Sequence, residues 1–526
     1  MARGRRGSTS SDHQLIDDND SSSDHEEEEP TTSRPQNDGP MPSISISIHL
    51  LSLALCLSSG FQQGYIASVL NQPYKQIEDY INSSWVERFD EPIPQQTLYF
   101  LWSFLNVCFP IATIFGQFLA AIMCKRLGRK KTALIASFAY IPGILLSSSA
   151  KYLHPMFELL FIGRIIWSMA NGINSVNATV WIVECAPPRI RGRMAAMQEF
   201  FMAIGSLVTQ AVGVPFSTET LWPMTFLPNL VVVIISLIMF AVVYESPQFI
   251  MEHENDPVKA RKALAAYHGV SVNDASVDAE MRICEESVNQ ETPKKKTVDT
   301  GFDVQHDGIA IMFKPWIAND DLSKVIRQAA WLGVMVKIAY VFTGARCLRA
   351  YSTFILHDMS HWSYANATWG SFIIGLLRVP FTLIPVFLVD SLGRRPLMVG
   401  STAISAAALV IMVVAIDVGD SFMAGSFIGL TILLLITACG IGSISRFYSA
   451  ELVPRHLLLS SVSMLTMFEA LTKIVIHGQS LLIFLAPTLV FLVIIWAFCP
   501  ETSRRTVNEV LNDVAKRKNL KIDLPM

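Results

Sequence analysis

Charge is scarce in this sequence. Asp, Glu, Lys and Arg make up 16% of the 526 residues, whereas hydrophobic residues make up 51%. There is no Gly-rich phosphate loop, no cluster with metal-ligand spacing and no nucleophile motif, and the histidines are scattered. These absences argue against an enzyme and predict that the protein needs no cofactor. The basic runs lie beside apolar stretches, so nothing in the sequence indicates nucleic-acid binding.

Long apolar runs take the place of charge. Segments 231–243, 403–416, 427–437 and 481–498 are apolar on every side. Because about 20 apolar residues suffice to cross a bilayer as a helix, the chain is predicted to be an all-α polytopic membrane protein embedded in lipid. We place twelve spans, at 43–70, 98–122, 132–150, 156–183, 192–214, 226–244, 326–356, 366–389, 396–416, 424–452, 457–476 and 479–499.

The distribution of cations predicts the orientation of these spans. Lys and Arg accumulate in cytoplasmic loops. Here they concentrate in the second, fourth and eighth loops, at 125–131, 189–193 and 394–395, while the odd-numbered loops are poor in cations. Both termini are therefore predicted to be cytoplasmic.

Glycosylation sequons give independent support for this topology. The sequons at Asn82 and Asn366 fall in the first and seventh loops, which are outside in this orientation. They favour a membrane of the secretory route, such as the plasma membrane. A third sequon at Asn177 lies inside a span and is interpreted as accidental. None of the eight cysteines falls in an outside loop, so no extracellular disulfide framework is expected.

The span pattern divides the chain into five parts. Residues 1–42 are rich in Ser, Asp and Glu and are predicted to form a disordered cytoplasmic tail. Six-helix bundles are expected at 43–245 and 323–500. The intervening 246–322 segment is predicted to be a cytoplasmic helical linker, because charged and apolar residues alternate at helical spacing over 245–269, while 289–307 is interpreted as a solvated stretch. Residues 501–526 are assigned to a cytoplasmic C-terminal tail.

Three landmarks occur twice, once in each bundle. "KRLGRKK" at 125–131 reappears as "DSLGRRP" at 390–396, "VECAPPRIRGR" at 183–193 as "AELVPRHLLLS" at 450–460, and "YESPQF" at 244–249 as "CPETSRR" at 499–505. Repeated halves of a membrane domain commonly flank a substrate path and rock against each other.

The repeated charges suggest a cytoplasmic gate. Glu184 with Arg129, and Glu451 with Arg394 or Arg395, could form ion pairs when the cytoplasmic side is closed. The alternative is ordinary topology signalling, which explains the cations but leaves the glutamates unexplained. The candidate gate residues are Arg129, Glu184, Arg189, Arg191, Arg394, Arg395, Glu451 and Arg455.

These motifs resemble those of a known family. With "GFQQGYIASVLNQP" at 60–73 and "RLGRKK", "APPRIRG", "ESPQF", "LGRRP", "AELVP" and "PETSRRTVNEV" in this order, the chain is similar to the sugar porters of the major facilitator superfamily. Its facilitative glucose transporters are the nearest likeness. The resemblance covers about residues 50–510. It implies a twelve-helix rocker fold and uniport or proton-coupled movement of a small hexose-like solute.

The central positions depart from the family pattern. Where the family carries "QQLSGIN", this chain has "YVFTGAR" at 340–346, and the tenth-helix "GPGPIPW" becomes "GIGSISR" at 440–446. Several neutral amides that suit sugar hydroxyls are replaced by charges. Alignment with the family gives Gln198, Glu199, Tyr340, Arg346, Arg378 and Glu469 as candidate substrate-binding residues.

Two interpretations of these charges remain open. Arg346 and Arg378 could bind an anionic group, with Glu199 or Glu469 contacting an ammonium or exchanging a proton. Alternatively the charges pair internally, as Glu469 and Lys473 could at i and i+4, while Arg349 and Arg446 snorkel toward the membrane surfaces.

Three functions are compatible with this sequence. Because the first span contains no Asp or Glu where family proton symporters keep one, facilitative transport of a small polar or charged solute is favoured, with glucose itself doubtful. Proton-coupled transport through Glu199 or Glu469 is an alternative. A membrane sensor that retains the fold without moving solute is another.

Overall fold

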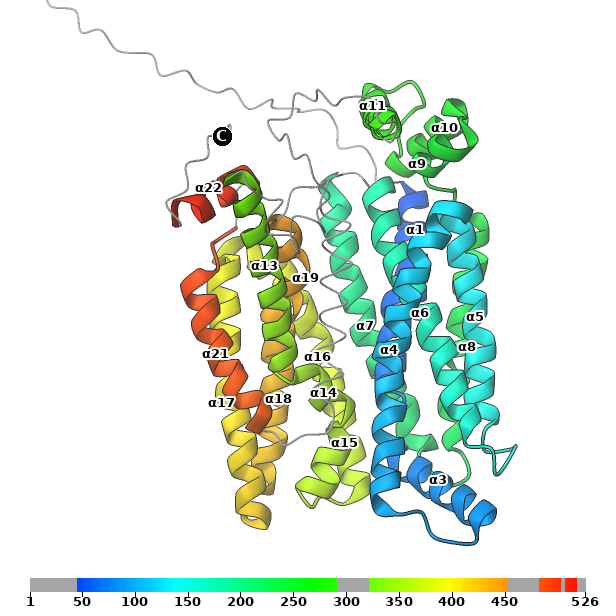
Figure 1. Ribbon diagram of the computed structural model, residues 1–526, viewed down its shortest axis with the longest axis vertical. Helices are drawn as coiled ribbons and strands as arrows, with labels where there is room; N and C mark the ends of the chain where they lie inside the picture. Colours follow the sequence, from blue (N-terminus) through cyan, green and yellow to red (C-terminus); the bar gives the residue numbers. More distant parts are fainter. Residues whose placement is uncertain (1–44, 187, 291–320, 453–481, 503–506, 518–526) are drawn as a thin grey trace, which may run out of the picture. The chain divides into compact units, whose positions relative to one another are not determined.

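The computed structural model describes residues 45–186, 188–290, 321–452, 482–502 and 507–517, and the regular structure in these ranges is helical (Figure 1). Helices occupy every predicted span except 457–476, which lies outside the described residues. Seven helices in the described part are long and apolar enough to cross a membrane by length and composition alone.

The first half contains an interrupted first span followed by five longer helices. The first span comprises α1 (Ile46–Leu55), a π-helical turn (Cys56–Phe61) and α2 (Gln62–Ser68). The others are α4 (Gln95–Leu127), α5 (Arg129–Ser149), α6 (Glu158–Cys185), α7 (Pro188–Phe216) and α8 (Asn229–Val242), the last preceded by a 3₁₀ turn at Trp222–Thr225.

The second half repeats this arrangement with more breaks. It contains α13 (Asp321–Phe342), α14 (Ala345–Ala350), α15 (Ser352–Phe354), a π-helical turn (Ile355–Met359), α16 (Tyr364–Leu392), α17 (Arg394–Val418), a 3₁₀ turn (Gly419–Phe422), α18 (Met423–Cys439), α19 (Ile441–Leu452) and α21 (Leu482–Phe498).

Helices outside the spans mark the two ends of the bundle. At one end lies α3 (Tyr74–Phe89), held by a 2.6 Å hydrogen bond from the Tyr80 hydroxyl to the Ala150 carbonyl. At the other end lie α9 (Pro247–Phe249), a π-helical turn (Ile250–Glu254), α10 (Pro257–His268) and α11 (Ala275–Gln290). Figure 1 shows α3 and α10 on opposite sides of the first half, so we refer to the α3 end and the α10 end.

Local chemistry explains where α10 begins and stops. The Asp256 side chain caps its first turn by accepting hydrogen bonds from the backbone N–H groups of Val258 and Lys259, and Pro257 stands at the first helical position. Gly269 ends it with φ +70°. The linker segment predicted to be helical thus contains α9, α10 and α11.

The segment assigned to the C-terminal tail also contains a helix. In α22 (Val507–Arg517), Val510, Leu511 and Val514 are buried in the same apolar cluster as residues of α13 and α19. Apolar side chains at i, i+1 and i+4 place one stripe of the helix against the bundle, which fixes it there.

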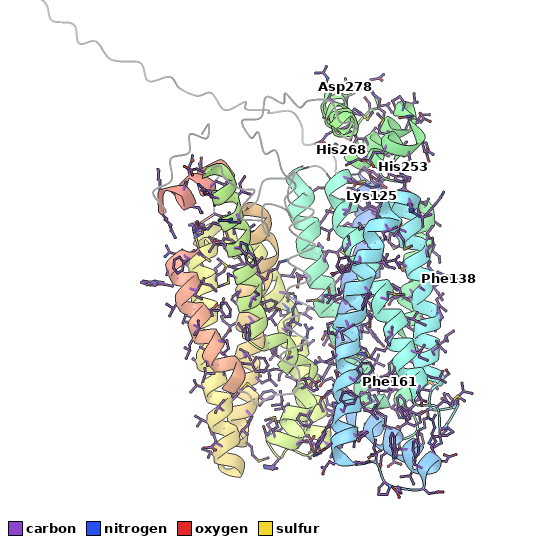
Figure 2. The ribbon with its side chains drawn as sticks, in the orientation of Figure 1. Lys125, Phe138, Phe161, His253, His268 and Asp278 are labelled. Carbon is purple, nitrogen blue, oxygen red and sulfur yellow. The ribbon has the colours of Figure 1, made fainter. Side chains whose placement is uncertain are left out.

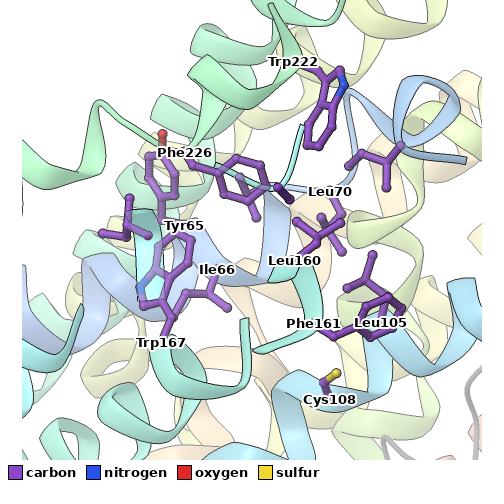
Figure 3. Close-up of a cluster of buried hydrophobic side chains, with 14 of the residues drawn as sticks. Tyr65, Ile66, Leu70, Leu105, Cys108, Leu160, Phe161, Trp167, Trp222 and Phe226 are labelled. Carbon is purple, nitrogen blue, oxygen red and sulfur yellow. The ribbon is translucent and has the colours of Figure 1, made fainter. Parts of the chain in front are cut away.

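An aromatic cluster holds the first span against α6 and α8 (Figure 3). The rings of Tyr65 and Trp167 are 6.0 Å apart, and those of Trp167 and Phe226 are 6.4 Å apart. The Tyr65 hydroxyl donates a 2.6 Å hydrogen bond to the Thr225 carbonyl. Buried aromatic pairs add about 0.5 to 1.5 kcal/mol each beyond their area, so this cluster fixes the position of the first span.

The outer surfaces of the helices are apolar. Phe138 on α5 points away from the bundle and is 65% exposed, and Phe115, Phe118, Val231 and Ile238 are similarly exposed (Figure 2). Exposed apolar side chains of this kind are expected where helices face lipid.

Glycines set the distance between the first span and α7. A Cβ added to Gly64 would lie 2.0 Å from the Met202 carbonyl oxygen, and one added to Gly205 would lie 2.2 Å from the Phe61 carbonyl oxygen. The two backbones are therefore in direct contact, as small residues allow in membrane helix packing. This contact positions the start of α7, which carries Gln198 and Glu199.

Candidate functional site

The seventh span is broken just before Arg346. Helix α13 ends at Phe342, Gly344 adopts the left-handed conformation with φ +73°, and α14 starts at Ala345. A Cβ on Gly344 would lie 2.9 Å from the Phe484 ring, so both the backbone angle and the space favour glycine here.

The tenth span is broken at the corresponding position of its sequence signature. Helix α18 ends at Cys439, and the Ser401 hydroxyl accepts a 2.9 Å hydrogen bond from the N–H of Ile441 at the start of α19. A Cβ on Gly440 would overlap Ser401, and a Cβ on Gly442 would lie 3.0 Å from the Tyr340 ring. The two interrupted spans therefore meet at Tyr340. Discontinuous helices in the interior of a membrane protein are a common place for solute sites.

Three arginines and Tyr340 gather at this junction. The guanidinium carbon of Arg346 lies 4.9 Å from the centroid of the Tyr340 ring, which is a cation–π contact. Arg349 and Arg378 are 6% and 8% exposed. Each of the three guanidinium groups interacts electrostatically with Tyr340, and Arg346 interacts with both other arginines.

Sequence reasoning missed two members of this region. Arg349 was expected to snorkel toward the membrane surface. It is instead buried, and the positive charges of Arg346 and Arg378 act on it. Its spacing of three from Arg346 was the available signal, because residues i and i+3 share a helix face. Lys337, one turn before Tyr340, is 5% exposed. A lysine within an otherwise apolar run could have identified it from the sequence, because a charge within a membrane span is costly.

The candidate residues of the first half lie on α7. Gln198 and Glu199 are both half-buried, and the backbone of Gln198 packs directly on Gly60. The Gln198 amide nitrogen is buried without a hydrogen-bond partner among the described residues. Glu469 lies outside the described residues, and the side chain of Arg446 is likewise not described.

Hydrogen bonds join the two halves at the α3 end. The Asn71 amide nitrogen donates to the hydroxyls of Ser352 (2.9 Å) and Ser371 (3.1 Å), which are themselves 2.6 Å apart. The N–H of Thr353 donates to the Asn71 carbonyl oxygen, and Gln210 on α7 donates to Ser371. All five residues are buried, and the network is neutral.

A charged layer surrounds this neutral network. The Tyr74 hydroxyl donates to the Asp358 carboxylate, and Lys75 Nζ lies 2.6 Å from His357 Nε2. His357 Nδ1 lies 2.6 Å from the Trp362 carbonyl, so Nδ1 carries the proton and Nε2 accepts from Lys75. Burial, with the Asp358 and Asp79 carboxylates, raises the pKa of Glu78 to about 7.

At the α10 end, Arg129 and Glu184 form an ion pair. Arg129 Nη2 lies 2.6 Å from Glu184 Oε1, and the side chains are 8% and 7% exposed. Ser246 donates to the other carboxylate oxygen of Glu184, and the guanidinium carbon of Arg129 lies 5.5 Å from the Phe249 ring centroid. Both partners belong to the first half, so this pair is formed within one bundle.

Glutamates cap α5 and α17 in the same way. Glu245 accepts hydrogen bonds of 2.9 and 3.0 Å from the N–H groups of Arg129 and Lys130. Glu501 accepts bonds of 2.8 and 2.9 Å from those of Arg394 and Arg395. A carboxylate at a helix N-terminus satisfies donors that lack an intrahelical partner.

The structure describes fewer contacts for the remaining gate candidates. Arg395 donates through Nη2 to the Trp496 carbonyl at 2.5 Å, as Lys130 does to the Ala241 carbonyl at 2.9 Å. Arg455 lies outside the described residues, and the side chains of Arg189, Arg191 and Glu451 are not described. The gating role of the whole set stays a prediction.

The sequon residues lie in helices at the α3 end. Asn82 is half-buried in α3, and Asn366 is exposed in the first turn of α16. Both therefore occur at the same end of the bundle, on helices of different halves.

Comparison with solved structures shows the fold. The inward-open xylose transporter XylE from E. coli matches with a TM-score of 0.68 at 18% identity, covering 89% of this chain and 99% of that chain. A XylE structure described as a major facilitator superfamily proton:xylose symporter bound to 6-bromo-6-deoxy-D-glucose matches equally well, with a TM-score of 0.68. The fold is therefore the one seen in these XylE structures.

Comparison with protein families is more specific. The model of the family described as "Sugar (and other) transporter" matches residues 51–513, and this chain belongs to that family. Facilitated glucose transporter member 1 of Gallus gallus is 25% identical over 479 residues, covering 88% of this chain and 92% of the relative. Member 3 of Ovis aries is 27% identical over 478 residues, covering 88% and 91%.

Proposed function

We propose that this protein moves a small hexose-like, polar or charged solute across the plasma membrane by facilitative alternating access. The meeting of two interrupted spans at Tyr340, between halves whose buried contacts at the α3 end join Asn71 to Ser352 and Ser371, carries this proposal. Breaks in the spans release backbone groups that can contact a solute.

The absence of a carboxylate from the first span supports uniport. No Asp or Glu occurs at 43–70. Glu199 on α7 is half-buried and supports the alternative, a proton-coupled carrier, since a carboxylate within the membrane can exchange a proton.

Uptake into liposomes reconstituted with the full chain tests transport directly. We expect saturable uptake from a panel of labelled hexoses, pentoses and sugar acids that does not follow an imposed pH gradient. Uptake that follows the gradient and loses this dependence in Glu199→Gln contradicts uniport. Absence of flux for every solute, from protein that is correctly inserted, favours the non-transporting sensor.

The α3 end is proposed to face the cell exterior, with both termini in the cytoplasm. Lys125 lies at the α10 end (Figure 2), and positive charge is expected on the cytoplasmic side of a membrane protein. Removal of N-glycans from protein made in a secretory cell is expected to shift its mobility, and Asn82→Gln with Asn366→Gln is expected to abolish that shift.

A further inference from the structure

The charge of the solute follows from what surrounds the buried arginines. An arginine at the centre of a membrane helix costs about 2.5 to 3.5 kcal/mol on insertion scales, and such groups normally pair with an opposite charge. Arg349 is only 6% exposed, and its Nε atom has no hydrogen-bond partner among the described residues.

Arg378 is in a similar position. It is 8% exposed, and its described electrostatic neighbours are Tyr340 and another arginine, Arg346. The largest electrostatic influences on Arg349 come from Arg378, Tyr340, Arg346 and Cys347. Within the described residues, then, the largest electrostatic influences on these two cations come from a phenol, a thiol and other cations.

A neutral sugar would not compensate this charge. Hydroxyl groups can accept hydrogen bonds from a guanidinium, but they leave its charge uncancelled in a water-poor interior. A carboxylate can accept two parallel N–H···O bonds from one guanidinium and cancel its charge, which makes such pairs short and strong. The Tyr340 ring holds Arg346 from one face, so that this guanidinium is oriented before a solute arrives.

We infer that the cluster of Arg346, Arg349 and Arg378 around Tyr340 binds an organic anion of hexose size, with a carboxylate as the group it recognises. This inference deepens the proposed transport function and rests on it for the claim that the bound anion is also carried. Arg346 and Arg378 are the residues expected to contact the carboxylate, and Arg349 adds positive potential beside them.

Paired ligands that differ in one group test the inference. D-glucuronate and D-glucose share a ring and differ by a carboxylate, as do D-galacturonate and D-galactose. Binding of all four to the purified full-length chain is measured by calorimetry at fixed salt. We expect at least one uronate to bind at least about tenfold more tightly than its neutral partner, which is the low end of a charge-assisted hydrogen bond.

Variants locate the binding site. Arg346→Gln and Arg378→Gln are each expected to weaken uronate binding by about tenfold or more and to weaken the binding of the neutral sugar by a smaller factor. Arg282→Gln, which removes the same charge from an exposed position on α11, serves as the matched control and is expected to bind like the natural chain. Arg346→Lys retains the charge but loses the planar fork, so an intermediate affinity is expected.

The outcomes separate this inference from the transport proposal. Equal affinity for uronate and neutral sugar, no uronate binding by the natural chain, or binding unchanged in both glutamine variants would overturn the anion site. Uronate binding that appears only after Glu469→Gln also overturns it, because the arginines are then neutralised internally. Uronate binding without flux in liposomes leaves the site standing and removes the transport function. If the glutamine variants do not fold, the comparison of ligands in the natural chain still decides.

Discussion

Glu245 and Glu501 occupy equivalent positions in the two halves and make the same contacts. Each carboxylate caps the helix that follows a positive-φ glycine, Gly128 with φ +87° or Gly393 with φ +88°, by accepting from the first two backbone N–H groups. A Cβ on either glycine would approach the carboxylate within 3 Å, at 2.7 and 2.9 Å. The repeated motif is therefore a turn and its cap.

Removal of either cap is expected to destabilise the chain. Glu245→Ala and Glu501→Ala each leave two helix N–H groups without their charged acceptor, at a cost of about 1.5 to 3 kcal/mol. Thermal unfolding in detergent measures the loss. Glu254→Ala removes a carboxylate that forms an exposed pair with Lys259, and is expected to cost less than about 1 kcal/mol. Equal effects at the three positions would contradict the capping role.

The Arg129–Glu184 pair predicts a strong asymmetry between single and double substitution. Arg129→Gln leaves Glu184 buried without its cation and is expected to cost about 3 to 5 kcal/mol. The double variant Arg129→Gln with Glu184→Gln removes both charges and is expected to recover most of that loss. Unfolding measurements on these two variants, on Glu184→Gln and on the natural chain form a double-mutant cycle, and simple additivity would show that the pair is not coupled.

Contact between the first span and α7 predicts a large effect from one methyl group. Gly64→Ala places a Cβ 2.0 Å from a carbonyl oxygen, so the helices must separate at a cost of about 1 to 3 kcal/mol. Because α7 carries Gln198 and Glu199, solute affinity is expected to fall as well. Gly400→Ala on α17 is the control, since nothing lies within 4 Å of its added Cβ, and it is expected to be neutral or slightly stabilising.

The Glu78 carboxyl predicts a pH dependence of closure at the α3 end. Its pKa is about 7 in this arrangement, against an ordinary value of 4.5. Between these two pH values Glu78 is therefore protonated when the α3 end is closed and ionised when Glu78 is solvated. Closure is therefore favoured below pH 4.5 and loses this contribution as pH rises through about 7, where ionised Glu78 repels Asp358 and Asp79.

Distances between spin labels on α3 and on the first turn of α16 measure that closure. The fraction of molecules whose α3 end is open is expected to rise between about pH 6 and pH 8 in the natural chain and to stay low in Glu78→Gln. An unchanged pH profile in Glu78→Gln would exclude Glu78 as the titrating group.

Some of this architecture could be predicted from the sequence, because hydrophobic runs and repeated motifs are local. The spans and the duplicated landmarks needed only run lengths and short motifs. The contacts of those landmarks could not be predicted from the sequence. The repetition of "YESPQF" as "CPETSRR" was visible, but the backbone N–H groups that the glutamates of these motifs bind lie more than a hundred residues earlier.

Some residues of the candidate site could be predicted from the sequence, but the backbone geometry that brings them together could not. Charges within spans singled out Arg346 and Arg378, since their desolvation cost is known for any sequence. The helix breaks at Gly344 and Gly440 were missed, because glycine within an apolar run is compatible with an unbroken helix. The pairing of Tyr74 with Asp358 joins residues of different halves, and no local pattern predicts it.

The two layers at the α3 end differ in how they respond to dissolved ions. The inner contacts of Asn71 with Ser352 and Ser371 are buried and uncharged, so mobile counterions have nothing there to screen. The outer layer of Lys75, Glu78 and Asp358 is partly exposed, and its interactions weaken as the Debye length falls from about 10 Å at 0.1 M to about 3 Å at 1 M. Salinity therefore tunes the pH sensitivity of this end while leaving its basal closure intact.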